Sequence, residues 1–300
     1  MKLSNPFPNE VLNLLPLSNL SGVNSRWVYP GGEVGVRVNV EDWSLRGMFR
    51  IQSAEDIIAF KMVLDAIEQN NGVPPVNLMI PYIPYARQDR VATKGDPLAI
   101  GVFARLIHYP ALAHVWCLDP HSSETENQFL RTGVAFHGAS PAFFIEQYIN
   151  KVAPGKKVVL VSPDKGAEQK TIRYLEDIDN AIGVIVCRKT REPVTGRLTQ
   201  AEFDRYIPKN IGECLNIKDD PNIELIVTDD ICDGGRTFMN LVELLDFEGF
   251  KNPVHLWTSH AIYSYGIDGL LKKFKTIGST NSFLHKHNHA NLITIPLDQQ

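Results

Sequence analysis

Two adjacent carboxylates followed by a glycine-rich turn are the residues whose chemistry is easiest to state from the sequence. Asp229 and Asp230 end the apolar run Leu225–Thr228, which is typical of a buried strand. Two acidic residues at a strand end can bind vicinal sugar hydroxyls or, through them, a hard cation. The turn that follows consists of Asp233, Gly234, Gly235, Arg236 and Thr237.

The glycines of this turn favour phosphate binding. Glycine lets the backbone approach a ligand closely, and the amide groups at the start of a following helix can hold a phosphate. The alternative interpretation is a turn whose aspartates only cap a helix.

Other polar clusters also stand directly after apolar runs. Functional groups collect beyond the carboxyl ends of parallel strands, so we expect these clusters at such sheet edges. The last of them is basic and precedes a stretch with Pro and Gly, which is typical of a mobile loop that closes over phosphates, or of a charged surface loop. The clusters are Tyr85–Arg90, Asp119–His121, Ser162–Gly166 and Arg188–Arg191.

The apolar runs alternate with amphipathic stretches along the chain. Near-continuous apolar strands between helices indicate parallel sheets covered on both faces. We therefore predict an α/β fold of two domains, each a mostly parallel sheet flanked by helices, with a boundary near Gly138–Ser140. The predicted strands are Val76–Ile80, His114–Leu118, Lys157–Val161, Ala181–Cys187, Leu225–Thr228 and Val254–Thr258, and the predicted helices are Ala54–Gln69, Pro97–His108, Gly166–Asp177 and Thr237–Phe247.

One segment narrows the interpretation to a family. Pro81–Arg90, which reads PYIPYARQDR, resembles a motif of the ribose-phosphate pyrophosphokinases, also called phosphoribosyl diphosphate synthetases. Asp119–Ser122, Ser162–Ala167 and the turn after Asp230 resemble further motifs of that family, in its order. The resemblance covers roughly residues 27–297 and implies two phosphoribosyltransferase-like domains, an ATP-binding one at 1–139 and a ribose-phosphate-binding one at 140–300.

The resemblance also implies which residues hold the diphosphoryl donor. His121 and Asp164 match positions that act with Mg2+, and His121 is also matched as catalytic, together with Lys189 and Arg191. The residues at ATP-binding positions are Tyr29, Glu33, Arg87, Gln88, Asp89 and Arg90. A hairpin turn is the alternative for the segment Tyr29–Glu33.

By the same resemblance, the reaction moves the β,γ-diphosphoryl group of Mg-ATP to the C1 hydroxyl of ribose 5-phosphate and leaves AMP. Asp229 and Asp230 would hold the ribose hydroxyls, and the turn from Asp233 to Thr237 would hold the 5-phosphate. The first alternative is the same transfer to the terminal ribose of ADP-ribose, as in phage routes that rebuild NAD. The second is an inactive regulatory homologue, and a plain phosphoribosyltransferase would have no use for the segment Pro81–Arg90.

The chain departs from the family pattern at identifiable places. Arg236 stands in a turn usually built from small residues, and Arg188 stands where histidine is usual. Gly31 lacks the side chain that the adenine-contacting segment normally has there. Because both ends of the sequence also differ from the family, we expect an assembly smaller than a hexamer, a homodimer or another homo-oligomer.

The composition excludes several other classes of protein. Lys and Arg number 30 against 34 Asp and Glu, and no basic block indicates a nucleic-acid partner. Neither a signal peptide nor an apolar stretch of bilayer length is visible, so we predict a cytoplasmic protein without a membrane partner. The run His285–His289 has metal-like spacing, but we interpret it as a solvated loop.

Overall fold

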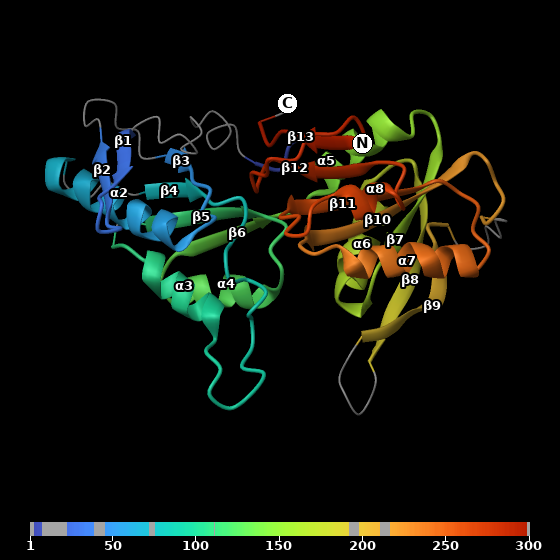
Figure 1. Cartoon of the computed structure of the whole chain (residues 1–300), viewed down its shortest axis with the longest axis horizontal. Coiled ribbons are helices and arrows are strands. Elements are labelled where there is room, and N and C mark those ends of the chain that lie inside the picture. The colour runs from blue at the N-terminus through green and yellow to red at the C-terminus, as the bar shows by residue number, and fades with distance from the viewer. Residues whose placement is uncertain are drawn as a thin grey trace. The chain divides into compact units, whose positions relative to one another are not determined.

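The computed structural model describes residues 3–7, 23–38, 46–71, 76–110, 112–191, 198–210 and 217–298. It divides the chain into two compact units (Figure 1). The first unit comprises residues 6–140, and the second comprises residues 1–5 together with 141–300. Asn5 belongs to the second unit because its side-chain amide donates a hydrogen bond to the carbonyl of Leu297 at 2.9 Å.

The first unit contains a parallel sheet in the order β3-β4-β5-β6 and a separate antiparallel hairpin of β1 and β2. Its strands are β1 (Val23–Val28), β2 (Val34–Val38), β3 (Arg46–Met48), β4 (Val76–Met79), β5 (Leu112–Leu118) and β6 (Ala135–Ala139), and its helices are α2 (Ala54–Asn71), α3 (Ala99–Ile107) and α4 (Ser123–Leu130).

The core of the first unit explains why these segments fold as they do. Helix α3 turns Ile100, Phe103 and Ile107 toward the sheet, at the three- and four-residue spacing of one helix face. Val115 and Cys117 point from β5 into the same core, as the alternation of a strand requires. Each fully buried side chain of this size contributes about 1.5–3 kcal/mol.

The second unit is built on a seven-stranded sheet in the order β13-β12-β11-β10-β7-β8-β9, which Figure 1 shows as a stack from β13 to β9. All neighbouring strands are parallel except β8 and β9. Its strands are β7 (Lys157–Ser162), β8 (Ala181–Arg191), β9 (Leu198–Pro208), β10 (Ile223–Cys232), β11 (Val254–Ala261), β12 (Ile277–Thr280) and β13 (Leu292–Ile295), and its helices are α5 (Ala142–Val152), α6 (Lys165–Asp177), α7 (Arg236–Phe247) and α8 (Asp268–Leu271).

Helices cover both faces of this sheet. On one face, α7 packs Leu241 and Leu245 into a core with Val227 of β10. On the other, the Tyr148 ring of α5 lies 5.4 Å from the Trp257 ring, and a Cβ at Gly278 would lie only 2.5 Å from the same tyrosine. Burial on both faces explains why β7 and the segment Leu225–Val227 of β10 read as near-continuous apolar runs.

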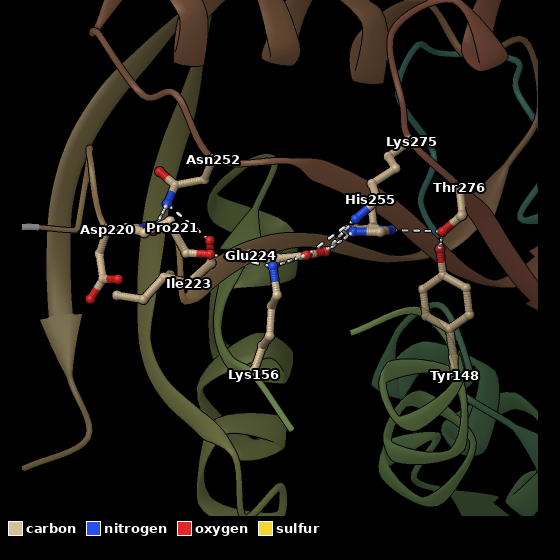
Figure 2. A network of polar contacts seen from close by, with 10 residues as sticks. All are labelled: Tyr148, Lys156, Asp220, Pro221, Ile223, Glu224, Asn252, His255, Lys275 and Thr276. Carbon is tan, nitrogen blue, oxygen red and sulfur yellow. Dashed lines mark hydrogen bonds and ion pairs between the residues drawn. The ribbon is translucent and has the colours of Figure 1, made fainter. Parts of the chain in front are cut away.

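A buried polar network ties the strand starts of the second unit together (Figure 2). Glu224 on β10 accepts from Lys156 at 2.9 Å, from Lys275 at 3.1 Å and from the His255 Nε2 at 2.5 Å. Burial lowers the pKa of His255, so its ring is neutral and donates through Nε2. The network lies at the edge of the sheet where β10 begins, away from the carboxylates at its end.

The other His255 nitrogen continues this network. Nδ1 lies 2.7 Å from the Thr276 hydroxyl, which lies 2.6 Å from the Tyr148 hydroxyl. A neutral ring that donates through Nε2 accepts at Nδ1, so Thr276 donates to the ring and accepts from Tyr148. The side-chain polar atoms of His255, Thr276 and Tyr148 thereby all have hydrogen-bond partners.

One predicted strand differs from the structure, and one segment takes the form of its alternative. The segment Tyr29–Glu33 is the loop of the β1–β2 hairpin, and its predicted contact with adenine stays a prediction. Strand β8 continues past the predicted end at Cys187, because Arg188 pairs with Glu202 across an antiparallel register that β9 supplies. Within the part of the chain that the structure describes, no helix is both long and apolar enough to cross a membrane.

Candidate active site

The two carboxylates predicted to bind ribose lie at the carboxyl end of β10. Asp230 is buried, with 7% of its surface exposed, and its amide donates to the Asp229 Oδ1 at 2.9 Å. Burial, followed by the neighbouring Asp230 charge, raises the pKa of Asp229 well above its ordinary value, and Asp164 adds to the rise. A carboxylate pair in these surroundings favours a ligand that brings hydroxyl protons or positive charge.

Asp164 begins helix α6 beside this pair. Its Oδ1 accepts from the amides of Gly166 at 2.9 Å and Ala167 at 3.1 Å, so it is a helix N-cap, which was the alternative to a magnesium ligand. Strands β7 and β10 are neighbours, and Asp164 acts electrostatically on Asp229. Both capping hydrogen bonds use the same carboxylate oxygen, Oδ1.

The carboxylates at this edge of the sheet are of the kind that can bind magnesium. Residues 3–7, 23–38, 46–71, 76–110, 112–191, 198–210 and 217–298 contain no group of three or more His, Cys, Asp or Glu side chains able to hold a metal ion. Mg2+ is commonly bound through one or two carboxylates, with substrate phosphates and water completing its octahedral shell. Asp164 and the Asp229–Asp230 pair supply carboxylates of that kind.

The glycine-rich turn after β10 opens helix α7. Gly235 caps the helix with a φ of 75°, and the amides of Phe238 and Met239 donate to its carbonyl at 3.1 and 3.2 Å. The amides of Arg236 and Thr237 precede these bonds, so they are the ones a phosphate at this helix start would use. The Arg236 side chain is exposed and Thr237 is half-buried.

In the first unit, backbone hydrogen bonds join the chain at the carboxyl ends of β4, β5 and β6. The amide of Leu118 donates to the Pro81 carbonyl at 3.1 Å, and that of Asp119 donates to the Ala139 carbonyl at 2.8 Å. Asp119 is buried and has a φ of 42°, a left-handed conformation that is uncommon for residues other than glycine and that aspartate adopts more readily than most. The segment at Pro81–Arg90 therefore lies beside the turn that carries His121.

Apolar anchors hold Pro81–Arg90 in place and leave its polar side chains outside. Ile83 and Ala86 are buried in the core, and the Tyr85 ring, on a backbone with φ of 64°, contacts Phe103 with centroids 5.9 Å apart. The predicted ATP-binding side chains of this segment are exposed, apart from one that is half-buried. They are Arg87, Gln88 and Arg90, with Asp89 half-buried.

The start of helix α4 follows His121. Ser122 is the cap residue, yet its hydroxyl makes no capping bond and is buried without a partner in the described residues. A buried hydroxyl left in this way costs free energy unless a ligand or water completes it. His121 itself is half-buried.

The predicted adenine-contacting segment is an exposed hairpin tip. Tyr29 and Glu33 are both exposed, the Tyr29 amide donates to the Glu33 carbonyl at 2.8 Å, and the Tyr29 ring meets Trp27 edge-on at 5.8 Å. Arg26 in β1 pairs with Asp56 of α2 at 2.6 Å, which fixes the hairpin on the first unit.

The predicted catalytic cations lie on the β8–β9 arm. The backbone of Lys189 and Arg191 belongs to β8, whereas their side chains, like residues 192–197, lie outside the described part of the chain. The sequence did not indicate the ion pairs that hold the antiparallel pair of β8 and β9, which we call the β8–β9 arm. Arg188 pairs with Asp204 at 3.0 Å, and Arg205 pairs with Asp204 and with Glu168 of α6.

The histidine run after β12 is less solvated than predicted. His285 and His287 are half-buried, and their rings contact the Tyr263 ring with centroids 5.2 and 6.1 Å apart. His289 is exposed, and its Nδ1 accepts from the Asn291 amide at 3.0 Å. The two half-buried rings are therefore packing partners of Tyr263, which periodicity could not indicate.

Comparison with known proteins finds ribose-phosphate pyrophosphokinases that are similar to this chain. No family model matches the chain. A putative ribose-phosphate pyrophosphokinase 2 of Streptococcus agalactiae is 24% identical over 282 residues, which are 91% of this chain and 78% of that protein. A ribose-phosphate pyrophosphokinase of Thermotoga maritima is 25% identical over 244 residues, which are 79% of this chain and 70% of that protein.

A solved structure has the same fold. The phosphoribosylpyrophosphate synthetase of Mycobacterium smegmatis superimposes with a TM-score of 0.73 at 19% identity, over 91% of this chain and 86% of that one. The predicted α/β fold of two phosphoribosyltransferase-like domains is thus confirmed. The chain is thus similar in sequence to ribose-phosphate pyrophosphokinases over most of its length, and it shares the fold of the solved synthetase, in agreement with the motifs.

Proposed function

We propose that the chain is a diphosphokinase-type transferase that moves the β,γ-diphosphoryl group of Mg-ATP to the C1 hydroxyl of ribose 5-phosphate. The relatives' names support this class of enzyme. The single observation that carries the proposal is the Asp229–Asp230 pair, half-buried at Asp229 and buried at Asp230, followed by the glycine-rich start of α7. One strand end thereby offers acceptors for sugar hydroxyls and amide donors for a phosphate.

The second unit would bind the acceptor sugar. Asp229 and Asp230 accept hydrogen bonds from two ribose hydroxyls, which offsets the burial and the neighbouring Asp230 charge that raise the pKa of Asp229. The 5-phosphate lies on the amides after Gly235, with the turn from Asp233 to Thr237 around it. With the sugar held at both ends, the C1 hydroxyl is oriented for attack on phosphorus.

The first unit would bind the nucleotide. Arg87 offers a planar, multi-donor side chain for the phosphates of ATP, and Gln88 offers an amide beside it on the anchored loop. The buried hydroxyl of Ser122 could donate a hydrogen bond to an oxygen atom of the nucleotide. Tyr29 and Glu33 on the hairpin are proposed to contact adenine, and Asp89 and Arg90 to support the loop.

Charge neutralisation completes the proposed mechanism. Mg2+ bound to the nucleotide neutralises phosphate charge, and we propose His121 and Asp164 as the residues that support it. Lys189 and Arg191 are proposed to donate to the diphosphoryl group while it moves between oxygens. The protein's part is to position the two substrates and to exclude water.

A product assay tests this function. The purified chain is mixed with ATP, ribose 5-phosphate and Mg2+, and phosphorus NMR follows AMP and the 1-diphosphorylated sugar, which are expected in equal amounts. Omitting either the acceptor or Mg2+ should stop AMP formation. A chain that binds both substrates but forms no product would be the inactive regulatory homologue.

A second candidate acceptor, ADP-ribose, is favoured by Arg236. This arginine is exposed at the first residue of α7, where a 5-monophosphate needs only backbone amides. A second phosphate beyond the first would find a cation with several donors there. We further propose that the chain works in the cytoplasm as a homodimer, which light scattering of the purified protein tests.

A further inference from the structure

The turn after β11 is fastened to the acceptor-binding turn after β10. The amides of Ile262 and Tyr263 donate to the Cys232 carbonyl at 2.9 and 3.1 Å. The next residue, Ser264, donates through its amide to the Asp233 carbonyl at 3.1 Å and through its hydroxyl to the Asp233 carboxylate. Four hydrogen bonds therefore fix the position of residue 265 relative to the acceptor-binding turn.

The residue held in this place is Tyr265, and its side chain stands in solvent. Its ring is 89% exposed, the highest value among the large apolar side chains of the described residues. A Cβ at Gly234 would lie 2.9 Å from two carbons of that ring, so the glycine is what lets the ring lie against the turn. An aromatic ring so exposed contributes little to the core, while a rigid turn presents it beside the proposed 5-phosphate site.

A cation stands on the same turn. Arg236 begins α7 directly after Gly235, its side chain is exposed, and no carboxylate among the described residues pairs with it. Ribose 5-phosphate ends at its 5-phosphate, so it would leave both Arg236 and Tyr265 in water. An acceptor that continues beyond the 5-phosphate would reach them.

We propose that Arg236 and Tyr265 form a subsite for the part of the acceptor that lies beyond its 5-phosphate. The arginine takes a second phosphate, and the ring stacks on an aromatic base, which fits a nucleoside diphosphate ribose. The inference rests on the proposed function, because it assigns the acceptor of that same site. Stacking on a ring and a charge-assisted hydrogen bond are the two interactions such a ligand needs.

Acceptor preference tests the subsite. The specificity constant kcat/KM is measured for ADP-ribose and for ribose 5-phosphate on the unchanged chain, on Tyr265→Ala and on Phe247→Ala. We expect Tyr265→Ala to lower the value for ADP-ribose by about tenfold or more and to change the value for ribose 5-phosphate by no more than about twofold. Tyr265→Phe keeps the ring and should keep the preference.

Phe247 is the matched control. It is 86% exposed and lies at the last residue of α7, the opposite end of that helix from Arg236. Its replacement should leave both acceptors unaffected. Arg236→Gly should lower the preference for ADP-ribose in the same direction as Tyr265→Ala, and calorimetric binding of ADP-ribose should weaken in both variants.

The outcomes separate the subsite from the function. If the unchanged chain transfers to neither acceptor, the proposed function itself fails. If it transfers to ribose 5-phosphate but not to ADP-ribose, or if Tyr265→Ala affects both acceptors equally, only the subsite is wrong. An equal loss accompanied by a change of mass in light scattering would assign the ring to a contact between copies of the chain and would also overturn the subsite.

Discussion

The two ends of strand β10 hold buried carboxylates in opposite surroundings. At the start of the strand, Glu224 is surrounded by Lys156, Lys275 and His255 (Figure 2). Burial by itself would raise the pKa of Glu224, but the hydrogen bonds from these three residues outweigh it and lower that pKa. A buried acid with several donors is stable as a carboxylate.

At the end of the same strand the charges have the same sign. Burial raises the pKa of Asp229 well above its ordinary value, and the neighbouring Asp230 carboxylate raises it further. The Asp229 carboxylate has acidic neighbours, Asp230 and Asp164, whereas Glu224 is surrounded by hydrogen-bond donors. The difference indicates that the residues at the start of β10 stabilise the fold, whereas those at its end bind a ligand. Neighbouring buried charges of the same sign lower stability, and such unfavourable arrangements are expected at functional sites.

The largest effect on stability should come from removing Glu224. Glu224→Ala leaves the fully buried His255 without the acceptor of its Nε2 proton and opens a cavity, so we expect a loss of about 3 kcal/mol. Hydrogen exchange of the β10 and β11 amides measures this loss within the second unit. Lys275→Ala is the control and should cost about 1 kcal/mol, because Lys156 and His255 still reach the carboxylate.

The strand end should respond in the opposite way. Asp229→Asn removes one of two like charges, so we expect the free energy of unfolding to stay unchanged or to rise by about 1 kcal/mol. The same change should lower kcat/KM for the acceptor by about a hundredfold or more, equal to about 2.7 kcal/mol, because a ribose hydroxyl loses its charged partner. A stable Asp229→Asn variant with an unchanged kcat/KM would contradict the assignment of the strand end to ligand binding.

The sequence predicts the carboxylates at the end of β10 but not the polar network at its start. Asp229 and Asp230 were identified because adjacent acids after an apolar run and before glycines have few structural explanations. Glu224 and His255 lie 31 residues apart, and they meet only because β10 and β11 pair in register. Such pairs depend on strand order, which local patterns do not contain.

The same reason explains the other omissions. The strands β7 and β10, both buried on both faces, were predicted from their apolar runs. The brace from Arg205 to Glu168 joins an edge strand to a helix, and Tyr265 follows a strand without any motif that would mark it. These residues became visible only when the fold brought neighbouring loops together.

The pH dependence should also have opposite signs at the two ends. Glu224 has a lowered pKa, so its contribution to stability is present above the unfolded value of about 4.3 and is lost as the pH falls through its folded pKa. Asp229 has a raised pKa, so it makes the folded unit less stable as the pH rises from about 3.9 toward its folded pKa.

Unfolding curves recorded without Mg2+ from pH 3 to pH 7 test these signs. The stability of Asp229→Asn minus that of the unchanged chain should become more positive as the pH rises. The stability of Glu224→Gln minus that of the unchanged chain should become more negative. Two differences with the same slope would contradict the assignment of opposite surroundings.

The smallest expected effect concerns the hydroxyl that extends the network to α5. Thr276 donates to the His255 Nδ1 and accepts from Tyr148, so Thr276→Val leaves two buried polar atoms without a partner while keeping the shape of the side chain. We expect a cost of about 1–2 kcal/mol and no change in kcat. Thr276→Ser retains the hydroxyl and should cost less than about 1 kcal/mol.

Thr171 provides the matched comparison at the other end of the strand. Its hydroxyl donates to the Ala167 carbonyl at 2.9 Å and lies 3.2 Å from the Thr228 hydroxyl. That carbonyl lies within α6, where the helix supplies it with backbone donors, so Thr171→Val should cost less than Thr276→Val. Hydrogen exchange of the β11 amides measures the loss of stability in both valine variants. If the two losses are equal, the hydrogen bonds from His255 through Thr276 to Tyr148 add no stability to the network around Glu224, and the stabilising contacts end at His255.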